Sequence, residues 1–438
     1  MLSKFFVCTI VATVLGTIGL MQLLEAWQRP AAALPYPLEA AWTDKEAAEP
    51  ARNIVRWNTL TGEQPKLVGH RGEKAFMPEH SRASYWQAAL EKADYIEPDL
   101  AMTKDGHLVV NHNEWLGSNT NVAEIKSLAH LRTNRTWTDN GQVVRKDNEW
   151  FIMDMTLEQI KQVRIRQDKQ YKWRPQHFDG IFQVLTFEEY LQIVRNATID
   201  AGGEFGVIPE LKSPKLYNQG RSYSRFFEDR AILTMEHYGW AQVSAHVNRS
   251  AHADLDLQPL RELPEGVQLG PSAWQSFDLD TAEYLASHTR SVPVVALLGS
   301  LPWTFTPWGL DKLMQFASIV SPWKDFFVAG ADPVFQANNV SWNATDIHKM
   351  GGFIPPHELV SEIHKRNMSV SPYTFYDSRQ DMAYLCQTNT SVGGFCPADK
   401  ADEFFYFFQQ GVDFMFVENI VEASLLRSRY ADRLEYRQ

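Results

Sequence analysis

The sequence predicts an α/β protein, a TIM (β/α)8 barrel with an insertion after the second-strand hairpin. Three observations support this prediction. Eight short apolar segments are spaced along residues 67–418, and amphipathic helical patterns separate most of them. The segments are nearly continuous in hydrophobic residues, which is typical of parallel strands covered on both faces. The chain of 438 residues can hold a barrel of about 250 residues together with insertions.

The first elements include an antiparallel hairpin. A strand is expected at 67–69, a helix at 81–92 with Ser81 as its N-cap, and a second strand at 95–103. Asp105 and Gly106 then precede another apolar run at 107–112. Asp-Gly is a strong hairpin turn, whereas a parallel connection needs a dozen residues or more. We therefore expect residues 107–112 to fold back antiparallel on the second strand.

The remaining chain alternates between strand and helix after a polar insertion. Residues 113–185 are rich in Asn, Arg and Trp, which predicts an insertion over one end of the fold with a short capped helix at 156–163. Thr186 and Glu189 form a capping-box pattern at the start of a helix at 186–196. Six further strands are expected at 206–212, 267–276, 292–298, 317–321, 369–374 and 412–418. Helices are expected at 223–237, from 280 onward, at 308–316, 356–367 and 402–410, and at the end of the chain.

Residues 1–33 differ in composition from the rest. An apolar run at 5–24 follows Lys4 and is about as long as a bilayer span. We expect either a cleaved signal peptide or an uncleaved signal-anchor at 1–33, a linker or irregular cap at 34–64, and the barrel at 65–430. Both forms place the chain in the secretory pathway, secreted or anchored by that segment. The net charge of −11 argues against binding to nucleic acid.

Sequons and cysteines agree with export. Glycosylation is expected at seven N-x-S/T sequons, which together favour an extracellular or lumenal chain: Asn134, Asn196, Asn248, Asn339, Asn343, Asn367 and Asn389. Cys8 lies in the apolar run, which leaves Cys386 and Cys396. In an oxidising compartment we expect these two to form a disulfide, with two free thiols as the alternative.

Side chains suited to chemistry fall at the predicted strand ends, where the active sites of such barrels lie. They are His70, Arg71, Glu97, Asp99, His112, Glu210 and Lys212. Three carboxylates on one rim repel each other, and a divalent cation that prefers oxygen ligands, Ca2+ or Mg2+, would relieve the repulsion. Two histidines can serve as general base and acid, and the two cations can hold an anion. Together these groups suit cleavage of a phosphodiester.

Three segments carry a resemblance to a known family. HRGEKAFMPEHS at 70–81, ADYIEPDLAMTKDGHLVVNH at 93–112 and IPELK at 208–212 resemble the signature segments of the glycerophosphodiester phosphodiesterase family, and the bacterial periplasmic branch most. The later segments WQSFD, SPYTF and GVDFMFVEN fall where that family has its later strands. The resemblance implies metal-dependent hydrolysis of glycerophosphodiesters to an alcohol and glycerol 3-phosphate.

The resemblance also implies roles for individual residues. His70 and His112 match the acid/base histidines, and Arg71 and Lys212 match the phosphate-contacting cations. The metal-ligand positions of the family correspond to Glu97, Asp99 and Glu210.

Three positions depart from the family pattern. Asn113 replaces an Asp after the second histidine, Gly117-Ser118-Asn119 replace an Asp-Arg pair, and Val417-Glu418 replace a Thr-Asp. These departures keep the direct ligands and bear on efficiency and substrate preference. Two alternatives therefore accompany the leading hypothesis: a phospholipase D-like phosphodiesterase acting on lysophospholipids, and a catalytically weak surface binding protein of the same fold.

Overall fold

A computed structural model describes residues 55–139, 141–244, 247–255, 257–378, 382 and 397–435. Residues 55–438 form one compact unit. The predicted apolar run at 5–24, both cysteines of the predicted disulfide and the sequon at Asn389 lie outside the described residues. Among the helices of the described ranges, none combines the length and apolar character that a membrane crossing requires.

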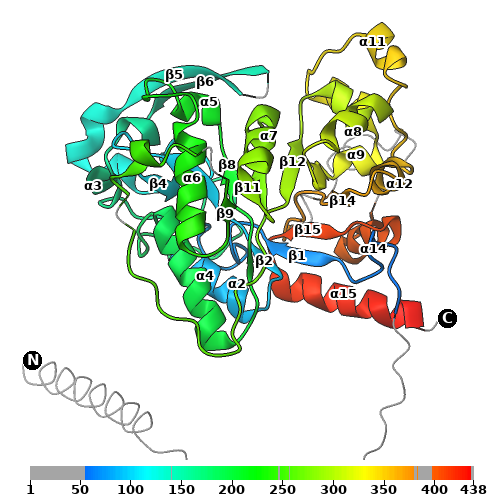
Figure 1. Ribbon diagram of the computed structural model, residues 1–438, viewed down its shortest axis with the longest axis horizontal. Helices are drawn as coiled ribbons and strands as arrows, with labels where there is room; N and C mark the ends of the chain where they lie inside the picture. Colours follow the sequence, from blue (N-terminus) through cyan, green and yellow to red (C-terminus); the bar gives the residue numbers. More distant parts are fainter. Residues whose placement is uncertain are drawn as a thin grey trace, which may run out of the picture. The chain divides into compact units, whose positions relative to one another are not determined.

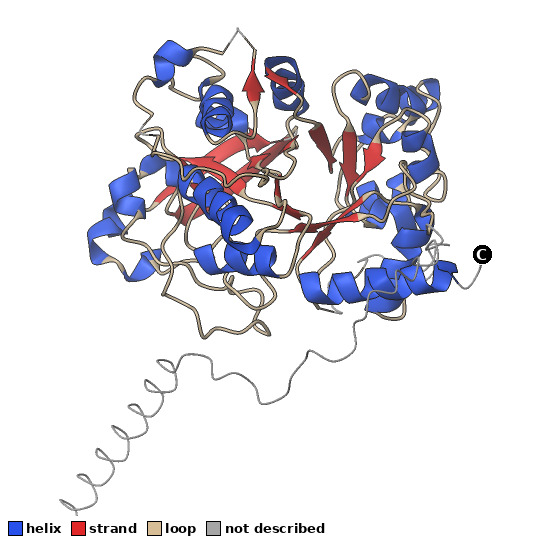
Figure 2. Cartoon of the chain, turned by 60° about the horizontal axis from the view of Figure 1, so that its bottom comes forward, coloured by secondary structure: helices blue, strands red, loops and turns tan. Residues whose placement is uncertain are grey.

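Parallel strands form a closed barrel with helices outside it (Figures 1 and 2). In order around the barrel the strands are β1 (Lys66–Gly69), β2 (Tyr95–Ile96) continued by β3 (Asp99–Met102), β7 (Gly206–Val207) continued by β8 (Glu210–Leu211), β10 (Trp274–Ser276), β12 (Val294–Leu298), β13 (Ile319–Pro322), β14 (Ser369–Val370) and β15 (Phe414–Val417).

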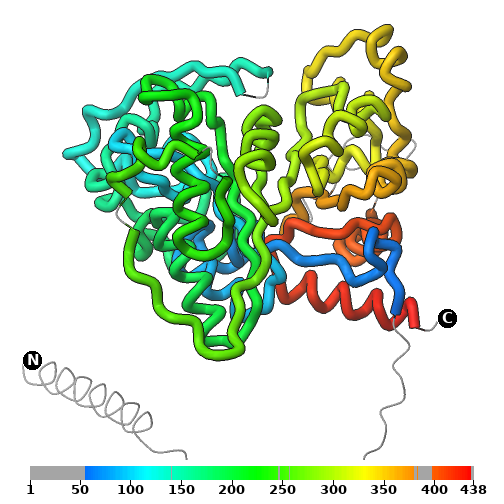
Figure 3. Tube along the Cα trace, viewed as in Figure 1, coloured from blue at the N-terminus to red at the C-terminus, as the bar shows by residue number. Residues whose placement is uncertain are grey.

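The first and last strands close the barrel. β1 pairs in parallel with β15, with Val68 opposite Phe416, so the two ends of the barrel sequence lie side by side (Figure 3). On the other side of β15, the Asp413 amide donates to the Val370 carbonyl at 2.9 Å, which joins β15 to β14. This closure confirms the predicted (β/α)8 barrel.

Prolines interrupt two strands that the sequence predicted as continuous. Pro98 separates β2 from β3, and Pro209 separates β7 from β8. Proline has no N–H and cannot donate to a sheet. Its carbonyl still accepts, because the Glu210 amide donates to Pro98 O at 2.9 Å and the Gln275 amide donates to Pro209 O at 3.0 Å. The strands therefore keep their direction, and Asp99 and Glu210 stand opposite each other in adjacent strands.

The predicted hairpin is confirmed. β4 (Leu108–Val110) pairs antiparallel with β3, with Leu100 opposite Val110. Gly106 in the turn has φ of +91°, a conformation that favours glycine. β4 is the edge strand of the seven-stranded sheet. Because it runs antiparallel to β3, the chain beyond Val110 returns toward the carboxyl ends of the barrel strands.

The strand expected within residues 267–276 is β10, which occupies only the end of that range and begins at Trp274. Gly270 lies so close to the backbone of Phe205 that an added Cβ would sit 2.3 Å from its carbonyl carbon. Pro271 has no amide hydrogen, although its carbonyl accepts from the Val207 amide at 2.9 Å. This segment follows β7 without forming a regular ladder.

The main helices agree with the predicted positions, with shifted ends. Ser81 caps α2 (Arg82–Leu90), and Thr186 with Glu189 forms the predicted capping box of α4 (Phe187–Ala201). The other main helices are α6 (Phe226–His237), α7 (Leu279–His288), α8 (Pro307–Leu313), α12 (Leu359–His364), α14 (Lys400–Gln410) and α15 (Ile420–Glu435).

Several short elements were not predicted. They are α5 (Pro214–Tyr217), α9 (Asp325–Val328), α10 (Ala331–Ala337), α11 (Ala344–Lys349), β9 (Gln242–Val243), β11 (Thr289–Arg290), η1 (Val122–Glu124), η2 (Lys126–Leu131), η3 (Ile152–Asp154), η4 (Arg249–His252) and η5 (Pro302–Phe305).

The segment 113–185 has structure of its own. It contains an antiparallel hairpin of β5 (Thr133–Asp139) and β6 (Gln142–Glu149), and the predicted capped helix α3 (Leu157–Ile160) after Thr156. The sequence pair Asn140-Gly141 is the hairpin signal that would have found β5 and β6. Their strands escaped prediction because Trp137 is the one fully buried side chain among the described residues of the two strands.

The hydrophobic core has two layers. A small group fills the barrel interior: Val68, Ile208, Ala273, Val295, Leu297, Ile319 and Phe416. A much larger group packs between the barrel and its helices and includes Trp274, Phe187 and Tyr190, all fully buried. The interior group closes the barrel as a packed core, so the polar side chains gather at the carboxyl ends of the strands.

Candidate active site

The structure brings together the seven side chains that the sequence selected. His70 and Arg71 follow β1, Glu97 lies at the break between β2 and β3, and Asp99 begins β3. Glu210 and Lys212 lie at and just after β8, and His112 lies two residues beyond β4. All seven are therefore positioned by the ends of three barrel strands and the hairpin.

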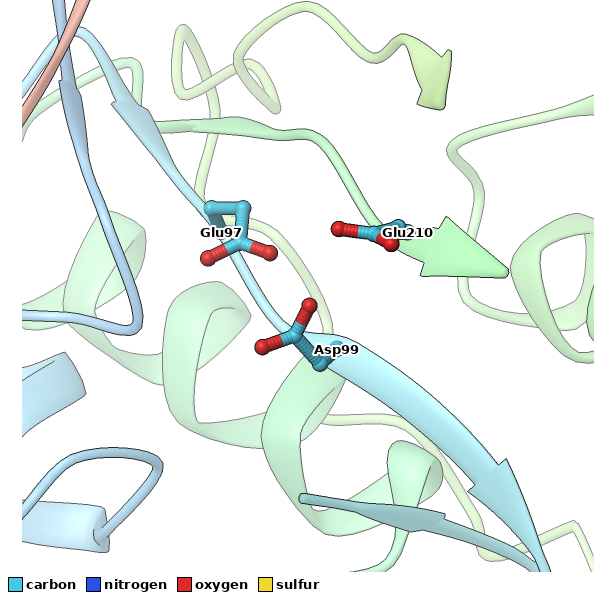
Figure 4. Close-up of side chains that lie close together, drawn as sticks. All are labelled: Glu97, Asp99 and Glu210. Atoms are coloured by element: carbon cyan, nitrogen blue, oxygen red, sulfur yellow. The ribbon is translucent and has the colours of Figure 1, made fainter. Parts of the chain in front are cut away.

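Three carboxylates converge at the centre of the site. Glu97, Asp99 and Glu210 are buried and each offers an oxygen such that these atoms all lie within 4.8 Å of one another. The side chains point toward one another from two adjacent strands (Figure 4). Burial, then the neighbouring Asp99, raises the pKa of Glu97 well above its usual range. Burial raises the pKa of Glu210 to about 8, against the opposing charge of Lys212.

Asp99 has the strongest positive surroundings of the three. Nε2 of His80 lies 2.9 Å from its Oδ2, Nε of Arg71 lies 3.2 Å from the same oxygen, and Nζ of Lys212 lies 3.8 Å from Oδ1. Although burial opposes ionisation, Lys212, the His80 hydrogen bond and Arg71 hold the pKa of Asp99 well below its usual range. Asp99 is thus the carboxylate that stays ionised.

His80, which sequence reading did not single out, contacts the site directly. Its Nδ1 lies 2.7 Å from the hydroxyl of Tyr85 while Nε2 contacts Asp99. Both His80 and Arg71 have positive φ, 58° and 63°. Non-glycine residues adopt this conformation mainly where surrounding contacts hold it. The Glu79 side chain is buried and pairs with Arg71 at 2.9 Å.

Both histidines of the predicted acid/base pair have a lowered pKa. Burial, then Lys74 and Arg71, lowers the pKa of His70, and burial, then Arg71 and Lys212, lowers the pKa of His112. Both imidazoles are therefore neutral in the substrate-free protein, and each has a nitrogen able to accept a proton.

A second ionic cluster borders His70 and was missed by sequence reading. The Glu418 carboxylate, fully buried after β15, accepts from Arg174 and lies 2.7 Å from Nζ of Lys74. Its Oε1 is 3.9 Å from Nδ1 of His70. Despite burial, Lys74 and Arg174 lower the pKa of Glu418. Its position after the last strand was a usable signal, whereas nothing in the sequence pattern marked Arg174.

Two departures from the family pattern contact each other. Nδ2 of Asn113 donates to the Ser118 hydroxyl at 2.8 Å, and Nδ2 of Asn111 donates to the Asn113 carbonyl at 2.6 Å. The amide beside His112 is thus held by the residues that replace the usual Asp-Arg pair. The departures from the family pattern at position 113 and at 117–119 therefore belong to one hydrogen-bonded arrangement.

Comparison with known proteins gives one consistent result. Residues 70–257 match the model of the glycerophosphoryl diester phosphodiesterase family. Glycerophosphodiester phosphodiesterase GDPD6 of Arabidopsis thaliana is 28% identical over 333 residues, covering 73% of this chain and 77% of the relative. Glycerophosphodiester phosphodiesterase of Haemophilus influenzae is 24% identical over 332 residues, covering 72% of this chain and 80% of the relative.

A solved structure supports the fold. A structure from Silicibacter pomeroyi DSS-3 that carries the same family name superposes with a TM-score of 0.50 at 14% identity, covering 86% of this chain and 98% of that one. At this identity the likeness concerns the barrel fold.

Proposed function

The chain belongs to the glycerophosphoryl diester phosphodiesterase family, and from this premise we propose that it hydrolyses glycerophosphodiesters to an alcohol and glycerol 3-phosphate. The observation that carries the proposal is the convergence of three buried carboxylates, two neutral imidazoles and two cations at the carboxyl ends of the barrel strands. The substrate is a small molecule, and the site has the parts that phosphodiester cleavage requires.

A divalent cation fits the carboxylate group. Glu97, Asp99 and Glu210 would hold it, because oxygen ligands suit Ca2+ and Mg2+ and because a positive ion offsets the burial and the repulsion that raise the pKa of Glu97. When bound, such an ion supplies Lewis-acid polarisation of phosphoryl oxygens. The amide of Arg71 donates to Oε2 of Glu97 at 2.8 Å and fixes the direction of that carboxylate.

The histidines move the protons. One of His70 and His112 accepts the proton of the glycerol 2-hydroxyl while the hydroxyl oxygen bonds to phosphorus. The other histidine donates a proton to the departing alcohol while the bond between phosphorus and the alcohol oxygen breaks. Water then opens the resulting cyclic phosphate with the roles exchanged. The phosphate charge favours the protonated imidazole that the first step needs. Arg71 and Lys212 bind that negative charge.

The proposal is tested with purified residues 55–438 and a panel of glycerophosphodiesters. We expect release of glycerol 3-phosphate with Ca2+ or Mg2+, and loss of the activity with EDTA. His112→Ala should lower kcat by at least about 100-fold, the usual contribution of a general acid or base. His130→Ala is the matched control, because His130 is exposed in η2. No turnover of any phosphodiester together with no bound metal would refute the proposal. Turnover of lysophospholipid alone would favour the phospholipase D-like alternative.

We further propose that the protein is exported, secreted or anchored by residues 5–24, and glycosylated. Five of the predicted acceptor side chains are exposed, namely Asn134, Asn248, Asn339, Asn343 and Asn367, and Asn196 is half-buried. A mobility shift on treatment with a peptide N-glycosidase, and recovery from the medium or the membrane fraction, test both points. An unshifted protein recovered from the cytosol would contradict them. Non-reducing mass mapping tests the disulfide between Cys386 and Cys396.

A further inference from the structure

An aromatic hollow adjoins the proposed site. Its volume is about 800 Å³, within the usual range of small-molecule sites, and five aromatic side chains line it: Tyr171, Trp173, Trp323, Tyr373 and Tyr376. A second hollow of about 400 Å³ is lined by Lys212, the predicted phosphate contact, and by Asp139, and shares Trp323 and Asn338 with the first. The space therefore runs from the position of the phosphate to the aromatic lining.

The charges around this hollow disfavour a cationic ligand. Among the described residues that line it there is no carboxylate, and the single charged side chain is Lys324, whose Nζ lies 2.9 Å from Glu403. The guanidinium of Arg174 lies 3.7 Å from the ring centroid of Tyr171, and Lys324 lies 5.3 Å from that of Tyr376. Two of the five rings thus already have a protein cation over one face, which leaves those faces unavailable to a quaternary ammonium group.

Uncharged hydroxyl groups suit the same lining. The side-chain amides of Gln170 and Asn338 offer donors and acceptors, and the Tyr373 hydroxyl, which donates to the Leu298 carbonyl, can still accept. The half-buried Trp323 and the 45% exposed Trp173 offer apolar ring faces. We propose that this hollow binds the alcohol that the enzyme releases, and that this alcohol is an uncharged, hydroxyl-rich headgroup such as inositol or glycerol. The inference rests on the proposed function and specifies its substrate class.

A substrate panel tests the preference. Release of glycerol 3-phosphate is measured from glycerophosphoinositol, glycerophosphoglycerol, glycerophosphocholine and glycerophosphoethanolamine. We expect kcat/KM at least tenfold higher for the first two, and the ratio between them distinguishes a ring from an open chain. Equal or faster turnover of glycerophosphocholine would overturn the inference while leaving the proposed function intact.

A binding measurement separates the inference from the proposed function. Calorimetric titration of the His112→Ala variant with glycerophosphoinositol and with glycerophosphocholine compares affinities without turnover. Tighter binding of the inositol compound by at least tenfold supports the headgroup assignment even if no substrate is hydrolysed. Equal affinities, or tighter binding of glycerophosphocholine, would overturn it.

Trp173→Ala tests whether the hollow is responsible. We expect a loss of about tenfold in kcat/KM for glycerophosphoinositol, mainly through KM, and a loss below twofold for glycerophosphocholine. Trp308→Ala is the matched control, because Trp308 is 43% exposed and is not among the described residues lining either hollow. An equal loss for both substrates, or none for either, would contradict the assignment of the hollow.

Discussion

Replacing Arg174 with methionine should weaken the fold and slow catalysis. Arg174 is 3% exposed, bonds to the buried Glu418 and stacks on Tyr171. Removal of one partner from a buried ion pair typically costs about 3–5 kcal/mol, because the other charge stays buried. Lys74 remains 2.7 Å from Glu418, so we place the cost at the lower end, about 3 kcal/mol.

The thermal midpoint gives a direct measure of this cost. Unfolding entropy of about 2.1 cal/mol/K per residue over the residues of unit 55–438 gives about 0.8 kcal/mol/K, so about 3 kcal/mol lowers Tm by about 4 °C. Arg166→Met is the control in the same segment. Its pair with Glu124 is exposed, with 32% and 60% of the two side chains accessible, and should cost below about 1 kcal/mol.

The same substitution should reduce kcat more than it changes KM. Glu418 faces Nδ1 of His70 at 3.9 Å, so a displaced carboxylate alters the position of the imidazole that we propose moves a proton. Arg174→Lys keeps the charge and should recover part of the loss. A Tm shift for Arg174→Met no larger than that for Arg166→Met, or unchanged kcat, would refute the reasoning.

Three further substitutions test the surroundings of the site. Burial raises the pKa of Glu73 to about 9 against a hydrogen bond from the Ile420 amide, so the folded chain keeps a proton that the unfolded chain releases near pH 4.5. The contribution of Glu73 to stability is therefore complete below pH 4.5 and is lost as pH rises toward 9. We expect the Tm of Glu73→Gln to fall less between pH 5 and 9 than the Tm of the unmodified protein. Parallel Tm profiles of the two proteins would contradict this. Gly72→Ala would place a Cβ 2.6 Å from the Ser84 carbonyl carbon at φ of +83°. We expect the free energy of unfolding, measured in urea, to fall by at least about 2 kcal/mol. An unchanged urea midpoint would show that the contact relaxes. Asn113→Asp should raise activity or leave it unchanged, because aspartate can accept from the Ser118 hydroxyl; a large loss would mean that the amide itself is needed.

Sequence reasoning succeeded where local rules decide the structure. The Asp105-Gly106 turn predicted the return strand that brings His112 back to the site, and the alternation of strand ends placed Glu97 and Asp99 beside Glu210. These inferences need only strand geometry and connection length. The division of the second strand at Pro98 could also have been predicted, because proline has no N–H to donate to a sheet.

The missed residues depend on tertiary contacts between distant segments. Arg174 reaches Glu418 across 244 positions of sequence, and neither the surrounding polar residues nor any periodicity predicts that pairing. Glu73 and Glu79 could not be assigned to the interior because a carboxylate is usually exposed unless it has a partner, and their partners were unknown. The positive φ of His80, which directs its ring to Asp99, has no sequence signal either.

The pairing of β1 with β15 fixes the order in which the enzyme becomes competent during its synthesis. Val68 lies opposite Phe416, and His70 borders Glu418, so the first strand has no partner on one side until β15 has been synthesised. Contacts of such large sequence separation form late and slowly. The three carboxylates and both imidazoles of the proposed site precede residue 213, yet the cluster that borders His70 is completed only by Glu418 after β15. Growing chains on the ribosome therefore lack the finished site until some two hundred further residues have been added.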